Sequence, residues 1–420
     1  MCPVANGRKR NMADNLELTS TAGKEVRLSG GFMISGLATG HALFHWVIQS
    51  FVVLLPEVQI AFQLSAVGVG AILTVRELAS AIVALPAGFI VDALRRHWGA
   101  ILALCIGGVS LGSLVMGFSP AYPLLLAGVA IVAIAHSIWH LPASASLSRH
   151  FSERRGMALS FHGVGGSVGD VAGPLVAGAM LMVLGWRGIL SVYATVPFFL
   201  AFLAAWSFKN IGGATEAQDA VIPLNTRIEM TKRLLANRVL WGIVLVRGLR
   251  AMSLVALLTV LPLYLGRDLE LSPFSRGFHI GLLIAIGLVA KPVMGNLSDH
   301  LGRKQVLVPG LLWSCAISLL LIFFSQGVAF TVLIALLGLF LYPDQPIVTA
   351  AALDIVGRDV ASTALGLISF ASFFMSALSP LIAGGLYQSF GVDAALYYVA
   401  ILFAMAAVVF AALPLATRPG

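Results

Sequence analysis

Five histidines lie within long apolar stretches of the sequence, where imidazole groups could carry protons or bind ligands. They are His41, His45, His136, His140 and His162. The first two are four positions apart, as are the third and fourth, so each pair shares one helix face, and Gln49 extends the first face. Imidazole titrates near neutral pH and could relay protons or bind an anion. We expect these side chains to line a polar cavity, with plain hydrogen bonding between helices as the alternative.

A metal site is not expected at either pair. Two histidines at this spacing are compatible with a metal ion, but no carboxylate or thiolate joins them at the spacing of ligands. The three cysteines, Cys2, Cys105 and Cys315, form no disulfide framework. No nucleophile–base pair or phosphate-binding loop is present in the sequence. We therefore predict no metal, no cofactor and no enzymatic activity.

Charged side chains occur within the same apolar stretches. The acids are Glu77, Asp170 and Asp344, and the bases are Arg76, Arg247, Arg250 and Lys291. A charge at the centre of a membrane costs about 2.5–3.5 kcal/mol or more on insertion scales, so each charge should face a partner or a cavity. The excess of bases favours an anionic substrate.

Each acid has its own expected role. Asp170 is the first candidate for a proton carrier, because a carboxyl group in an apolar environment can exchange a proton in the working pH range. A permanent ion pair with an arginine is the equal alternative, and Glu77 and Asp344 are the further candidates. Successive helical residues point about 100° apart, so we expect Arg76 and Glu77 to reach different helices and not to pair. Asp344 follows Tyr342 in a run with two prolines, which should loosen the helix beside a cavity.

The composition predicts that lipid, and not water, surrounds most of the chain. Of the 420 residues, 59% are hydrophobic and 10% are charged, with a mean hydropathy of +0.95. A soluble protein carries about 25% charged residues. A helix needs about 20 apolar residues to cross a bilayer. Twelve stretches meet this need: 31–55, 65–91, 98–118, 122–147, 157–184, 188–206, 241–265, 276–297, 305–324, 328–353, 361–388 and 393–415.

The basic residues predict how these spans are oriented. Residues 1–30 form a polar tail and 208–240 a polar linker, between halves at 31–207 and 241–420. With both termini in the cytoplasm, 19 of the 26 Lys and Arg residues lie on the cytoplasmic side and three in the outer loops. This alternation from loop to loop predicts a cell-membrane protein, in a bacterium the inner membrane. It accounts for the net charge of +8 without a nucleic acid partner.

Two similar loop motifs indicate that the halves are copies of one unit. The first contains Gly88, Asp92, Arg95 and Arg96, and the second contains Gly295, Asp299, Gly302, Arg303 and Lys304. Their aspartates are 207 positions apart (299 minus 92), and several prolines repeat at offsets of 204 to 206. Such a shared offset is typical of transporters built from internal repeats.

With these motifs, the chain from about residue 31 to 415 resembles the major facilitator superfamily. The resemblance implies a charge relay at the helix ends around Asp92 and Asp299, which holds one conformation and releases it during transport. Simple capping and topology-setting charges are the alternative. In the first motif, Ala93 stands where the family has arginine and Arg95 where it has glycine.

The fifth span carries a glycine motif. Its members are Gly165, Gly169, Gly173, Pro174 and Gly178. Glycines repeated every four residues line one helix face and allow a neighbouring backbone to approach closely. The motif resembles that of the antiporter branch of the superfamily, and a tight helix crossing with no bearing on direction is the alternative. The segments around His140 and Gly156, together with Arg250 and Pro262, resemble the fosmidomycin-resistance branch.

The sequence thus predicts an all-α membrane protein with twelve transmembrane helices in two pseudo-symmetric six-helix bundles. The expected function is proton-coupled export of a small organic compound, a drug or an organic anion, by alternating access. Uptake of an organic anion by symport, with Arg76 and Arg250 holding it, is the alternative. A membrane sensor without transport is a third hypothesis. The resemblance implies a monomer that binds a small molecule and protons.

Overall fold

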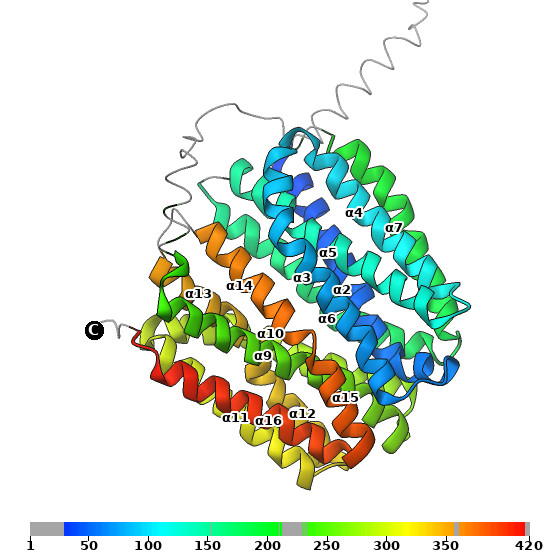
Figure 1. Cartoon of the computed structure of the whole chain (residues 1–420). Coiled ribbons are helices and arrows are strands. Elements are labelled where there is room, and N and C mark those ends of the chain that lie inside the picture. The colour runs from blue at the N-terminus through cyan, green and yellow to red at the C-terminus, as the bar shows by residue number, and fades with distance from the viewer. Residues whose placement is uncertain are drawn as a thin grey trace, which may run out of the picture.

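The computed structural model describes residues 29–151, 153–209, 211, 229, 232, 234–356 and 361–415. The side chains at 85, 87–90, 92–93, 155 and 361–363 also lie outside this description. The tail and most of the linker therefore lie outside the described residues. Within them, the regular structure is entirely helical (Figure 1).

The first half of the chain forms six long helices. They are α2 (Gly30–Ala61), α3 (Ala66–Ala93), α4 (Trp98–Gly117), α5 (Tyr122–His150), α6 (Arg155–Met180) and α7 (Trp186–Ser207), with the short 3₁₀ helix η1 (Arg95–His97) after α3. The second half contains α9 (Arg238–Leu263), its π-helical extension η2 (Tyr264–Asp268), α10 (Pro273–Leu301), α11 (Arg303–Phe323), α12 (Gly327–Leu341), α13 (Asp344–Val356), α14 (Ala361–Ser376), α15 (Ser379–Phe390) and α16 (Val392–Ala412).

The number of spans agrees with the sequence. Eleven helical segments in the described part are long and apolar enough to cross a membrane, with α12–α13 and α14–α15 each forming one span. The remaining long helix, α6, has 26 residues, but its seven glycines, together with His162 and Asp170, lower its hydropathy. With α6 counted, the twelve predicted helices are present. Large apolar side chains such as Phe199 and Val328, 65% and 81% exposed, suit a lipid-facing surface.

The two broken spans have local causes. Between α12 and α13 the chain passes through Tyr342 and Pro343, and proline cannot donate the hydrogen bond that would continue the helix. This is the break that the sequence predicts. A second break, between α14 and α15, precedes Pro380, the second residue of α15, and was not expected.

Helix α6 packs on α2 more extensively than any other pair of helices in the described part of the chain. A Cβ atom added at Gly165, Gly169 or Gly173 would overlap backbone atoms of Ala38, Ala42 and Trp46 respectively. The offset between partners is 127 positions in each case (165 minus 38, 169 minus 42 and 173 minus 46). The two helices therefore run parallel and in register, in contact through their backbones. Gly178 lies instead against α10, at the carbonyl oxygen of Pro273.

The two halves lie side by side (Figure 1). We call the helix ends near residues 208–240, such as Ser207 and Arg238, the linker face, and the other ends the far face. On the far-face side, α3 and α6 contact α15 and α10 at positions where a side chain would collide, including Gly70 against Pro380 and Gly277 against Pro174. Arg276 of α10 also pairs there with Glu57 of α2.

Toward the linker face the facing helices α6 and α10 leave apolar side chains exposed. Val164 and Val168 on α6 are 55% and 53% exposed, and Val289 and Val293 on α10 are 72% and 61% exposed. Among the described glycines of these two helices, only those near the far-face ends approach the other helix closely. Helices α6 and α10 therefore lie further apart toward the linker face.

We predict that Gly169→Ala destabilises the protein while Gly163→Ala, on the same helix, does not. The added methyl group at Gly169 would meet the Ala42 carbonyl oxygen, whereas nothing lies within 4 Å of a Cβ at Gly163. Overpacking of this kind costs about 1–3 kcal/mol. The measurement is thermal unfolding of the two purified variants in detergent. Equal melting temperatures would contradict the backbone contact.

Candidate functional site

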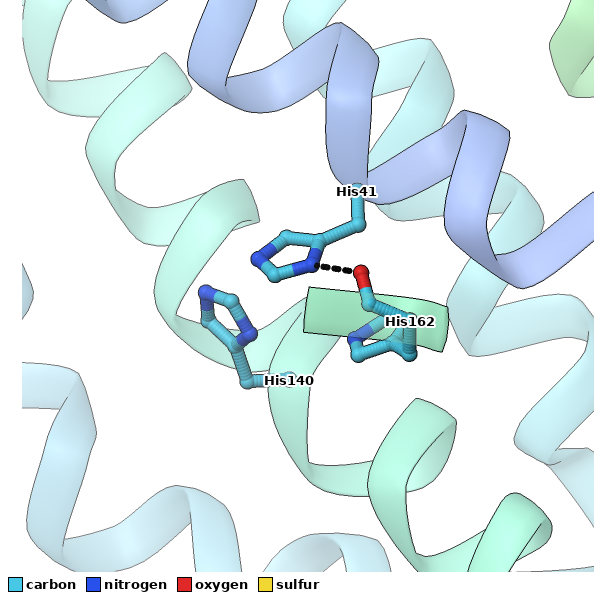
Figure 2. A group of neighbouring side chains, drawn as sticks. All are labelled: His41, His140 and His162. Carbon is cyan, nitrogen blue, oxygen red and sulfur yellow. Dashed lines mark hydrogen bonds between the residues drawn. The ribbon is translucent and has the colours of Figure 1, made fainter. Parts of the chain in front are cut away.

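The five histidines of the apolar spans meet in one place. His41 and His45 come from α2, His136 and His140 from α5, and His162 from α6, and we call these five residues the histidine cluster. The imidazole rings of His41 and His162 stack with centroids 4.2 Å apart. His41 also lies 4.6 Å from His45 and 4.8 Å from His140, in edge-on contact. Figure 2 shows three of these rings, from three helices, turned toward one another.

Backbone and side-chain groups orient the rings. His41 donates from Nδ1 to the carbonyl oxygen of His162 at 2.8 Å (Figure 2). The Nε2 atoms of His136 and His140 are 3.0 Å apart, so one ring donates and the other accepts. Both ring nitrogens of His162 are shielded from solvent, and neither makes a hydrogen bond of normal geometry, although the ring is close enough to the backbone of Leu37 to interact with it. Gly166 lets the His41 ring lie directly over the α6 backbone.

Asp170 also lies on the contact between α2 and α6, beside His45. His45 donates from Nδ1 to a carboxylate oxygen of Asp170 at 2.7 Å, and Asp170 is 8% exposed. Gln49 is also close enough to act on this carboxylate, and so is Lys291 from α10 of the second half. The Asp170 carboxylate thus has a histidine as its ion-pair partner and an ammonium group across the interface.

The second half contains a different buried pair. Arg250 donates from Nε to a carboxylate oxygen of Asp344 at 2.7 Å and from Nη2 to the carbonyl oxygen of Leu341 at 2.5 Å. Both side chains of the ion pair are 4% exposed. The break between α12 and α13 frees the Leu341 carbonyl and places Asp344 at the start of α13. The predicted loosening of this helix therefore positions a buried ion pair.

Other cations near this break lack an ion-pair partner in the described part of the chain. Arg247 donates only one long hydrogen bond, of 3.4 Å, to the carbonyl oxygen of Gln345, and its Nε atom is buried without a partner. The ammonium group of Lys291 lies 5.8 Å from the centre of the Tyr342 ring, whose buried hydroxyl group also has no partner.

The prediction for Arg76 and Glu77 is wrong. Arg76 donates from Nε and Nη2 to one carboxylate oxygen of Glu77, at 3.0 and 2.9 Å. The angular argument considered only the directions in which the two side chains leave the helix, and the long arginine side chain bends back to its neighbour. The other carboxylate oxygen accepts a 2.8 Å hydrogen bond from Ser376 of α14, so Glu77 joins the two halves. Arg76 is therefore not free to hold a substrate by itself.

The two loop motifs differ in what the structure shows of them. In the second, Arg303 pairs with Asp299 and with Asp354 of α13, and Lys304 donates to the carbonyl oxygen of Ala411 in α16. Gly302 ends α10 with a φ of +101°, and Gly295 lies in open space. These bonds all lie within the second half. A charge relay between conformations stays a prediction.

In the first loop motif, the side-chain surroundings of Gly88 and Asp92 lie outside the described residues. Arg95 lies 6.0 Å from the ring centre of Trp98, and Arg96 is exposed.

Several contacts carry no signal in the sequence. The pair of Glu57 and Arg276 joins residues 219 positions apart, which no local pattern connects. The sequence predicts Lys291 as an intramembrane base but not its position near Asp170. The two histidine pairs were visible as helix faces, but their meeting with His162 depends on how α2, α5 and α6 pack. Only a model of helix packing could have found these contacts.

Comparison with known proteins gives consistent results. The family model described as Major Facilitator Superfamily matches residues 37–290 and 246–420. A probable L-galactonate transporter of Escherichia coli is 24% identical, over 76% of this chain and 75% of its own length. The fosmidomycin resistance protein of the same organism is 23% identical, over 72% and 74%. An uncharacterized MFS-type transporter of Bacillus subtilis, YfnC, is 23% identical, over 70% and 71%.

Solved structures agree with the fold. A bacterial homolog of the human lysosomal transporter Spinster, in an inward-facing and unoccupied conformation, has a TM-score of 0.76 at 16% identity, covering 90% of this chain and 96% of that one. A D-xylose–proton symporter has a TM-score of 0.73 at 16% identity, covering 93% and 99%.

We predict that Arg250→Met and Asp344→Leu are each strongly destabilising, whereas the double variant recovers much of the loss. Removal of one partner leaves an uncompensated buried charge, which costs about 3–5 kcal/mol, while apolar replacement of both partners is close to neutral. Thermal unfolding of the four proteins in detergent measures this. Additive losses in the double variant would contradict the pairing.

Proposed function

Because the chain belongs to the major facilitator superfamily, whose members are membrane transporters and not enzymes, we propose that it exports a small organic anion in exchange for protons. Asp170 carries the proton in this proposal, and cations of the second half hold the anion. The chain acts as a monomer in the cell membrane, with the linker face in the cytoplasm. The observation that carries the proposal is the different partner of each intramembrane acid.

The bonding partner of Asp170 differs in kind from the partners of Glu77 and Asp344. Glu77 and Asp344 are bound to arginines, and guanidinium groups stay charged at all working pH values. A carboxylate held by such a group keeps its negative charge. Asp170 is held by His45, whose Nδ1 proton it accepts, so this carboxylate has no permanent cation bonded to it. Uptake of a proton by Asp170 therefore breaks no bond to an arginine, although it weakens the interactions with His45, Gln49 and Lys291.

The cations of the second half support an anionic substrate. Arg250 and Arg76, expected to hold the anion, are neutralised by their own acids. Lys291 and Arg247 are not, and the hydroxyl group of Tyr342 beside Lys291 has no partner. An anion bound beside Lys291 would satisfy its ammonium group and the hydroxyl group of Tyr342. It would also lie within reach of the charge on Asp170, so the ionised Asp170 carboxylate and the anion would compete for Lys291.

Two kinds of observation bear on the direction of transport. Helices α6 and α10 lie further apart toward the linker face, which the distribution of Lys and Arg predicts to be cytoplasmic, so substrate would enter from inside. The similarity to the fosmidomycin resistance protein favours export. The similarity to a probable L-galactonate transporter favours uptake of an organic anion, which is the second candidate.

We expect Asp170→Asn to abolish transport driven by a pH gradient while substrate exchange at equal pH persists, because exchange needs no net proton movement. An efflux-deficient bacterial host expressing either form, tested against fosmidomycin, other small phosphonates and carboxylates, and lipophilic cations, identifies the substrate. Proteoliposomes with the identified compound then separate gradient-driven transport from exchange.

The matched control for this experiment is Asp393→Asn, which removes an acid at the far-face start of α16. This variant should transport like the wild type. Gradient-driven transport that survives in Asp170→Asn would move proton coupling to another group. Accumulation of the compound in place of resistance to it would establish uptake.

We expect Lys291→Gln to raise the KM for the anion by about 10–100-fold, because a hydrogen bond to a charged group contributes about 1.5–3 kcal/mol. Lys291→Arg should retain most of the affinity. Initial rates of uptake into proteoliposomes measure both variants. An unchanged KM in Lys291→Gln would exclude this cation from the binding site.

A further inference from the structure

The histidine cluster has a geometry that neither proton transfer nor anion binding requires. We propose that it binds one divalent transition-metal ion of the Zn²⁺ class, with His41, His140 and His162 as ligands. The available ligand atoms of these three residues lie within 4.8 Å of one another. Neutral imidazole is the commonest metal ligand in proteins, and three histidines with a fourth, open position form a known arrangement for Zn²⁺.

The orientation of His41 is that of a metal ligand. A ligating histidine donates its other ring N–H to a carbonyl or carboxylate group, which fixes the ring and its tautomer. His41 makes this bond from Nδ1 to the carbonyl oxygen of His162, at 2.8 Å. The lone pair on Nε2 is thereby left for a ligand. The His41 ring packs directly on the backbone of Gly166, which has no side chain.

His162 supplies the second, independent observation. Both of its ring nitrogens are buried, and the backbone of Leu37 is close enough to interact with only one of them, outside normal hydrogen-bond geometry. Buried polar atoms without a partner are rare in folded proteins, so the other nitrogen calls for a ligand. A metal ion shared with His41 and His140 would satisfy one of these nitrogens. The stacked position of the His162 ring, shown in Figure 2, places it beside both other ligands.

A second group of three histidines, His45, His136 and His140, meets the same distance limit. It is the poorer candidate. His45 is bonded to Asp170, all three side chains of this group are only partly buried, and none of them has a buried ring nitrogen without a partner. Because His140 belongs to both groups, the two positions compete for it.

The chemistry of the site limits which ion it would take. Three imidazole ligands without a carboxylate or thiolate favour Zn²⁺, Co²⁺, Ni²⁺ or Cu²⁺ over Mg²⁺ and Ca²⁺, which prefer oxygen. The three ligands are neutral, so the ion would keep its full charge. Water or an anion would complete its coordination.

The test uses Co²⁺, whose absorption spectrum reports tetrahedral coordination, and Zn²⁺ in competition with a chromophoric chelator, on the purified full-length protein in detergent. We expect one ion per chain, and a thermal unfolding temperature that rises with metal concentration. His140→Gln and His162→Gln should each weaken binding by roughly 100-fold or more, since even partners of a ligand contribute about 10–100-fold. His136→Gln removes a hydrogen-bond partner of His140 and no ligand, so it should keep the site and weaken binding by no more than about 10–100-fold.

The matched control is His279→Gln, which removes a histidine of α10 that is bonded to Ser275 and Thr331, outside the cluster. This variant should retain the site. The proposal is overturned if the wild type shows no saturable binding, if His140→Gln binds as the wild type does, or if His136→Gln loses the site as completely as His162→Gln. Binding is measured without transport, so its failure would leave the role of Asp170 untouched.

Discussion

The direct backbone contact between α2 and α6 determines where every polar group of the first half lies. Glycines at 165, 169 and 173 let the two helices run in register at a constant offset. The polar residues on α6 then fall at the same levels as those on α2, with His162 beside His41 and Asp170 beside His45. A larger residue at any of the three glycines would separate both pairs. The glycines that lower the hydropathy of α6 thus also make its packing possible.

The intramembrane aspartates of the two halves differ in whether their charge can change. The arginine–aspartate pair of the second half is fully enclosed and bonded also to a backbone carbonyl, which suits a fixed structural element. The aspartate of the first half is bonded to a histidine, which allows its charge to change. Glu77 stands between these cases, since it is held by an arginine of its own helix and by Ser376 of the other half. Opening of the far face would have to break this last bond.

The sequence was sufficient for the architecture and for the faces of single helices, but not for contacts between them. Twelve spans, the break at Tyr342 and Pro343 and the glycine face of α6 all follow from local patterns, because each depends on residues close together in the chain. Arg250 and Asp344 are 94 positions apart, and the five histidines come from three helices, so no local pattern pairs them. The error at Arg76 and Glu77 arose from treating a long side chain as a fixed direction. The break before Pro380 was missed because one proline within a span more often bends a helix than ends it.

The pair of Arg276 and Glu57 has a consequence for the medium in which the protein works. The Arg276 side chain is 5% exposed and that of Glu57 is 25% exposed, so dissolved ions reach the pair from one side only. Ion pairs that are partly buried are screened much less than those on a surface. The far face should therefore stay closed with nearly the same strength in dilute and in saline surroundings.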